Sequence, residues 1–135
     1  MAWTFKNGRP IYLQIADIIK RDIFVGKYAA GDKIPGVREL ALVAAVNPNT
    51  IQHAMNLLEE EGILVTPSTA GRFVTDDAET LARLRDAFAE SECREFVSGL
   101  DSIGLDREQI LSIVKRVVSS SGDGSEQIKN TEENT

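Results

Sequence analysis

The chain has 135 residues, 42% of them apolar, which is enough for one small domain with an appendage. No apolar run approaches the ~18 residues that would span a bilayer, and residues 1–10 lack the pattern of a signal peptide. The single cysteine, Cys93, excludes an internal disulfide, so we expect a cytoplasmic protein without membrane contact.

The formal net charge of −6 is unevenly distributed. Residues 1–75 carry eight basic and seven acidic side chains, a net charge of +1, whereas residues 76–135 carry seven basic and fourteen acidic ones, a net charge of −7. The acidity therefore belongs to the second part of the chain. Charge alone neither favours nor excludes contact of the first part with a polyanion.

The first predicted helix covers residues 11–25, where isoleucines recur at helical spacing. Pro10 suits its first turn and Gly26 suits its end. Gly31 and Asp32 then indicate a turn, and the next two residues, 33–34, indicate a short extended stretch.

Two short helices follow, separated by about three or four residues. The first begins after Gly36 and ends before Asn47, because the residue before a proline is disfavoured in a helix. Asn47 is a favourable N-cap and Pro48 a favourable first residue for the second helix, which ends at Gly62. Two short helices with such a connection are typical of a helix-turn-helix.

A β-hairpin is predicted directly after this pair. Residues 63–66 and 72–74 indicate two strands, and residues 67–71, Pro-Ser-Thr-Ala-Gly, have turn chemistry. A hairpin that follows a helix-turn-helix is a wing. Residues 1–75 are therefore predicted to form a winged helix-turn-helix domain.

The rest of the chain is predicted to be helical and then disordered. After a boundary at residues 75–77, apolar positions indicate one helix over about 78–103 and a second from Asp106, whose spacing to Gln109 matches a capping box. Residues 119–135 are rich in Ser, Gly, Glu and Asn, which predicts a disordered tail. The predicted fold class is mostly α (α+β), with a two-stranded wing and a two-helix dimerisation segment over residues 76–118.

Several motifs together resemble the GntR family of bacterial transcription regulators. They are residues 31–41 (Gly-Asp-Lys-Ile-Pro-Gly-Val-Arg-Glu-Leu-Ala), residues 46–51 (Val-Asn-Pro-Asn-Thr-Ile), Ala54, residues 58–62 and the wing residues 71–74. The Asn-Pro-Asn-Thr run and the short helical C-terminus are similar to the YtrA-like subfamily. The resemblance implies a transcription regulator that binds double-stranded DNA, a repressor on a two-fold symmetric operator. The chain departs from the family at Pro48, Gln52 and Ala70, where many members carry arginines or a polar or basic wing tip.

Candidate DNA-binding residues lie at the helix starts and on the wing. Arg38 can bind phosphate or guanine, or form a surface ion pair with Glu39. The front of the third helix offers amide, hydroxyl and imidazole groups for base edges and phosphate, although its asparagines also suit a capping role. Gly71 allows a positive φ or close approach to the minor groove, and Arg72 either reaches phosphate or is an exposed strand residue. The predicted set is Arg38, Asn49, Thr50, Gln52, His53, Gly71 and Arg72.

The apolar residues of the last two helices exceed what two helices can bury between themselves. Such a surplus marks an interface, and we expect a homodimer. The predicted dimerisation residues are Leu81, Leu84, Phe88, Phe96, Leu100, Ile110, Val114 and Val117, and Cys93 is expected to pack in a helix interface.

Other classes of protein are less consistent with the sequence. One histidine and one cysteine exclude a Cys/His zinc site, and neither a nucleophile elbow nor a phosphate-binding glycine loop is present. We therefore expect no enzyme and no cofactor, and the sequence identifies no small-molecule effector. The alternative hypothesis is a winged-helix module that binds another protein without binding DNA. The polar front of the third helix, without apolar anchors, favours DNA.

Overall fold

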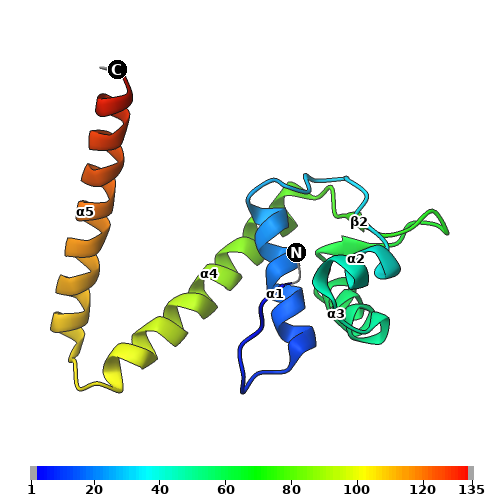
Figure 1. Ribbon diagram of the computed structural model, residues 1–135, viewed down its shortest axis with the longest axis horizontal. Coiled ribbons are helices and arrows are strands. Elements are labelled where there is room, and N and C mark those ends of the chain that lie inside the picture. The colour runs from blue at the N-terminus through cyan, green and yellow to red at the C-terminus, as the bar shows by residue number, and fades with distance from the viewer. Residues whose placement is uncertain (1–2, 134–135) are drawn as a thin grey trace. The chain divides into compact units, whose positions relative to one another are not determined.

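The structure, a computed structural model, describes residues 3–133, with side chains to residue 121 (Figure 1). Its elements in chain order are α1 (Ile11–Phe24), α2 (Val37–Ala44), α3 (Pro48–Glu61), β1 (Leu64–Val65), β2 (Phe73–Val74), α4 (Ala78–Asp101) and α5 (Arg107–Glu133). They form two compact units, Met1–Ala87 and Phe88–Thr135, and the division falls within α4. The mostly helical fold with a two-stranded wing confirms the predicted fold class.

The core of the first unit lies mainly between α1 and α3. Ile15 and Ile19 of α1 are buried together with Ile51, Met55 and Leu58 of α3. These residues recur at helical spacing, so each helix buries one stripe and leaves its opposite face outward. The orientation of α3, and of its polar face, follows from this packing.

The junction between α2 and α3 has the geometry of a helix-turn-helix. Ala45 ends α2 in the left-handed region, with φ 58° and ψ 48°. The side chain of Asn47 accepts a hydrogen bond from the backbone N–H of Asn49 at 2.8 Å, and Pro48 is the first residue of α3. The cap and the helix start predicted from the Asn-Pro pair are both confirmed.

The wing has a third segment on its edge. β1 and β2 are antiparallel, with Leu64 opposite Val74 and Val65 opposite Phe73. On the other side of β2, Lys33 forms an isolated bridge with Phe73. The extended stretch predicted at residues 33–34 is thereby tied to the wing.

The first turns of α4 belong to the winged-helix unit. Leu81 and Leu84 are half-buried and pack against its core, although they were predicted as dimerisation residues. This core covers part of each side chain within the chain, and contact of either leucine with a second copy stays a prediction. The compact unit therefore extends beyond residue 75, where the sequence predicted a boundary.

The predicted capping box at the start of α5 is present. Asp106 and Gln109 each accept a hydrogen bond from the other's backbone N–H, both at 2.9 Å. The backbone of α5 continues to Glu133, whereas the sequence predicted a disordered tail over residues 119–135. The composition of this segment shows that Ile128 is its only strongly apolar residue, but a helix forms its hydrogen bonds within itself. Residues 134–135 lie outside the described part of the chain.

Candidate nucleic-acid interface

The outward face of α3 is polar. Ile51, Ala54 and Met55 are buried, whereas Asn49 and His53 are exposed on the same helix. Thr50 and Gln52 are half-buried. The structure thus brings the four predicted α3 residues to the first turns of one helix. Pro48 has no backbone N–H, and those of Asn49 and Thr50 already donate to Asn47, so a ligand would meet side chains here.

Two of these side chains are held by neighbours. The amide of Gln52 donates a hydrogen bond to the side-chain oxygen of Asn56, one turn later, at 2.8 Å. The ring of His53 stacks on Tyr12 of α1, with centroids 3.6 Å apart and an interplanar angle of 9°. Tyr12 was not predicted as a site residue, because its position beside α3 depends on the packing of α1. The stack covers one face of the His53 ring.

Arg38 lies in the first turn of α2 with its side chain exposed. Within the described residues it forms no ion pair, so the predicted alternative of a pair with Glu39 is not observed. An exposed, always-charged guanidinium at this position can fork onto a phosphate or a guanine edge.

Gly71 and Arg72 have different environments on the wing. Gly71 has φ +122°, and a Cβ at this position would lie 2.8 Å from Cε of Lys33. The positive φ favours glycine here, whereas the end of the flexible Lys33 side chain could move away from a Cβ. Arg72 is half-buried, and its Nε donates to the carboxylate of Glu59 on α3. Arg72 is thus not the exposed strand residue that one interpretation of the sequence proposed, and phosphate binding by it would compete with an internal ion pair.

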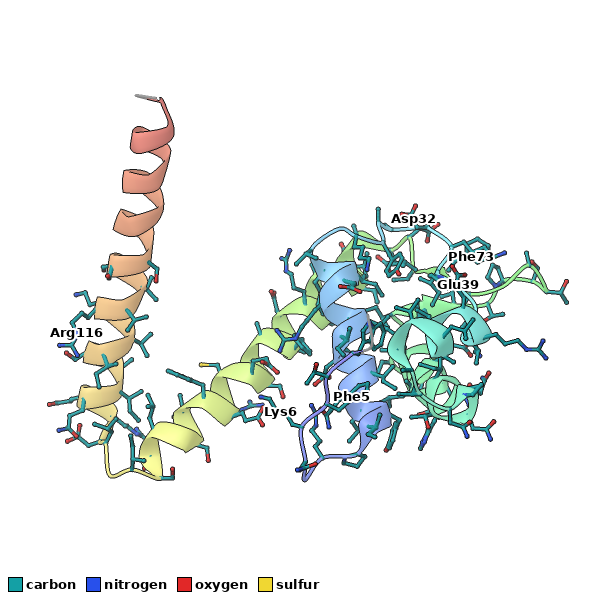
Figure 2. The ribbon with its side chains drawn as sticks, in the orientation of Figure 1. Phe5, Lys6, Asp32, Glu39, Phe73 and Arg116 are labelled. Atoms are coloured by element: carbon teal, nitrogen blue, oxygen red, sulfur yellow. The ribbon has the colours of Figure 1, made fainter. Side chains whose placement is uncertain are left out.

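A hollow of about 710 Å³ lies between the wing and the start of α2. Figure 2 shows Asp32, Glu39 and Phe73 on this side of the unit. The lining side chains that carry a charge or a hydrogen-bonding group are Tyr28, Lys33, Glu39, Thr66, Ser68, Thr69 and Arg72. It adjoins the polar turn of the wing. The Lys33 ammonium and the hydroxyls of Ser68 and Thr69 can bind an oxyanion, whereas the Glu39 carboxylate, which lines the same hollow, opposes one.

The acidic C-terminal end of α3 is partly neutralised. Glu59 pairs with Arg72, and Glu61 pairs with Lys20 of α1 at 2.7 Å. These pairs reduce the negative field that three consecutive glutamates would otherwise place beside the wing. The near-neutral charge of residues 1–75 therefore does not oppose contact with a polyanion.

In the second unit, several predicted dimerisation residues lie at the surface of the chain. Phe96 is 53% exposed and Val117 is 56% exposed. Phe88, Leu100 and Val114 are half-buried. Ile110, by contrast, is 7% exposed, so it contributes to the interior of this unit. Cys93 is exposed rather than packed within the chain.

The prediction from sequence did not include several exposed apolar residues in its dimerisation set. They are Val97, Ile103, Leu111 and Val118. Leu111 and Val118 had a detectable signal, because they widen the apolar stripe of the last helix beyond one face.

Among the described residues, no three His, Cys, Asp or Glu side chains gather to hold a metal. Within the same residues, no helix has the length and apolarity that crossing a bilayer requires.

A helix-turn-helix whose second helix presents a polar face, followed by a hairpin, defines a winged helix-turn-helix DNA-binding domain. Comparison with known proteins agrees. The profile described as "Bacterial regulatory proteins, gntR family" matches residues 11–74.

Full-length relatives and solved structures extend this match. The chain is 38% identical to the uncharacterized HTH-type transcriptional regulator YhcF of Bacillus subtilis, over 82% of this chain and 92% of that protein. It is 30% identical to the HTH-type transcriptional repressor YtrA of Bacillus subtilis, over 83% and 87%. A GntR family transcriptional regulator from Listeria monocytogenes has a TM-score of 0.74 and 38% identity, covering 83% of this chain and 98% of that one. The chain therefore belongs to the GntR family of transcription regulators, which are not enzymes, and the YtrA-like resemblance is confirmed.

The DNA-binding part also resembles a protein solved on DNA. The AraR DNA-binding domain in complex with operator ORX1 has a TM-score of 0.50 and 30% identity, and it covers 53% of this chain and 93% of that one. The chain is thus a transcription regulator with a DNA-binding domain of this kind.

Proposed function

We propose that the protein is a cytoplasmic repressor that binds a two-fold symmetric operator in double-stranded DNA as a homodimer. The observation that carries this proposal is the start of α3, where Asn49 and His53 are exposed opposite a fully buried apolar stripe. A helix with such a polar N-terminal face fits the major groove, whose base edges carry a distinct donor and acceptor pattern.

In this arrangement, six of the seven predicted residues have a defined function, and Arg72 stays in its ion pair with Glu59. Asn49 reads a base edge, Thr50 and Arg38 bind phosphate or an adjacent base, and Gln52 and His53 border the contact. Gly71 allows the wing backbone to approach the minor groove. The AraR domain, which was solved with an operator, supports this orientation because its fold is similar.

The proposal of a dimer is supported by the second unit. Phe96, Leu111 and Val117 are each more than half exposed, and a second copy supplies an identical apolar surface that covers them. One winged helix grips only a few base pairs, and two-fold symmetry places two recognition helices on half-sites about one helical turn, or a multiple, apart. The repressor activity is proposed from the relative YtrA, which is named a transcriptional repressor.

The experiment that tests this function uses the full chain and genomic fragments. DNA bound at moderate salt is recovered and sequenced, and the enriched sites are examined for two-fold symmetry. A reporter driven by an enriched site is then measured with and without the protein. Enrichment of a symmetric site and lower reporter output support the proposal. Absence of DNA enrichment, together with recovery of a specific protein partner, would support the protein-binding alternative instead.

A further inference from the structure

Lys33 belongs structurally to the wing, although it lies in the connection between α1 and α2. It bridges Phe73 of β2. The neighbouring backbone N–H of Ile34 donates to the carbonyl of Arg72 at 3.0 Å, and that of Val74 donates to the carbonyl of Asp32 at 2.8 Å. The backbone at Lys33 is therefore held against the wing, and its side chain starts from a fixed position.

The side chain of Lys33 crosses the wing at Gly71. A Cβ at Gly71 would lie 2.8 Å from Cε and 3.6 Å from Nζ of Lys33. The absent side chain of glycine thus leaves the space that the end of the lysine occupies. This close approach places the ammonium group beside the turn of the wing.

Lys33 is the available cation at the hollow between the wing and α2. Of the two cations that line it, Arg72 is paired with Glu59. Within the described residues, Lys33 forms no ion pair. The adjacent carboxylate, that of Asp32, has a different partner, because it accepts a hydrogen bond from the backbone N–H of Ala29 at 2.8 Å. The turn at residues 67–71 carries no charged side chain, so no other cation is present at the tip.

We infer that Lys33 is the phosphate-binding cation of the wing, and this inference rests on the proposed binding of DNA. An ammonium group is a mobile point charge that suits a phosphate oxygen rather than a particular base edge. Ser68 and Thr69 line the same hollow and offer hydroxyl donors beside it, whereas the hydroxyl of Thr66 already donates to Glu59. Contacts of this kind set affinity and register and are independent of base sequence.

The test compares Lys33→Met with Lys115→Met, which removes one exposed lysine from α5. Dissociation constants are measured against salt concentration, on the enriched site and on unrelated DNA of equal length. For Lys33→Met we expect a loss of about three- to tenfold on both DNAs, and a salt slope smaller by about 0.9. Lys33→Arg should restore the slope, and Lys115→Met should match the wild type.

Specific results overturn the inference. If Lys33→Met keeps the affinity and slope of the wild type, Lys33 does not bind phosphate, although the proposed function stands. A loss confined to the enriched site, with an unchanged slope, indicates base reading and also overturns it. If the wild-type protein binds neither DNA, the proposed function and this inference both fail. Lys33→Gln provides a second neutral variant, and thermal unfolding identifies any variant that has lost its fold.

Discussion

Glu59 of α3 is ion-paired with Arg72 at the base of β2, and the same carboxylate oxygen accepts a hydrogen bond from the hydroxyl of Thr66 at 3.0 Å. One side chain of α3 thus contacts both arms of the wing. Because Arg72 and Glu59 are each only partly exposed, this interaction is less screened than a surface pair. It sets the position of the wing relative to α3.

Replacing Glu59 with Gln should therefore loosen the wing. The half-buried guanidinium loses its charged partner, and we expect the free energy of unfolding to fall by about 1–2 kcal/mol. Operator affinity should fall too, because the wing is less well positioned. Urea unfolding and DNA binding measure the two effects, and Glu60→Gln, an exposed neighbour on α3, is the control. Tighter DNA binding with unchanged stability would show instead that Glu59 withholds Arg72 from phosphate.

Asn49→Ala should weaken operator binding and reduce discrimination. The side chain is exposed, and its own backbone N–H is already bound to the cap Asn47, so the substitution leaves the start of α3 intact. We expect a loss of about 1–3 kcal/mol on the operator, with relaxed preference at one or two base pairs, as for one base contact. Competition binding with single-site operator variants measures it, and Asn7→Ala serves as control. Equal operator affinity for wild type and variant would contradict the base-reading role.

Asp77 makes the start of α4 sensitive to acid. The hydroxyl and backbone N–H of Thr80 both donate to its carboxylate, as does the N–H of Glu79, and these bonds hold the pKa of Asp77 below its ordinary value of 3.8. A depressed pKa in the folded state means that the stabilisation is complete above the unfolded value. It is lost as the pH falls through the lower folded value.

Asp77→Ala should therefore lower Tm at neutral pH, and the difference from the wild type should shrink as the pH falls below 3.8. Thermal unfolding followed by circular dichroism over this range measures the difference. Asp76→Ala, the adjacent exposed carboxylate, is the matched control. A Tm difference that stays constant down to the lowest pH would show that the cap does not depend on the charge of Asp77.

Local signals explain which parts of the fold were predictable. Asn47, Pro48 and Gly62 define the ends of α3 through interactions within a few residues, so its bounds follow from sequence. The stack of Tyr12 on His53 and the pair of Arg72 with Glu59 join residues that are distant in the chain. Such contacts depend on how α1 and the wing pack on α3, which periodicity does not specify.

The predicted dimerisation set shows that a sequence pattern can predict which side chains are apolar and aligned without predicting what they pack against. An apolar stripe along α4 predicted Leu81 and Leu84 as dimerisation residues. Within the chain they are half-buried against the core of the winged-helix unit, and their contact with a second copy stays a prediction. Phe96 and Val117 belong to similar stripes and remain exposed in the chain. Sequence periodicity identifies the apolar face of a helix, whereas only the packed structure identifies the element that this face contacts. The DNA-binding residues also stay predictions, because the DNA that they are predicted to bind is a separate molecule.

Replacing Val114 and Val117 together with Asp should convert the protein to monomers. Val117 is 56% exposed, and a carboxylate placed on this apolar face would be desolvated on association without a partner. Loss of the two-fold arrangement should lower operator affinity on the order of a hundredfold or more, because the second half-site is no longer bound in an intramolecular step. The winged-helix unit should stay folded, since its core lies within the first unit.

Sedimentation equilibrium and operator binding measure both effects on the full chain. Replacing Ser112 and Ser119 with Asp adds the same charge to the opposite side of α5, where both serines are exposed, and should leave the dimer intact. If both double variants dissociate equally, added negative charge rather than the apolar face controls assembly. A wild-type chain that remains monomeric at micromolar concentration would remove the basis for a symmetric operator, since each protomer would then bind its half-site alone.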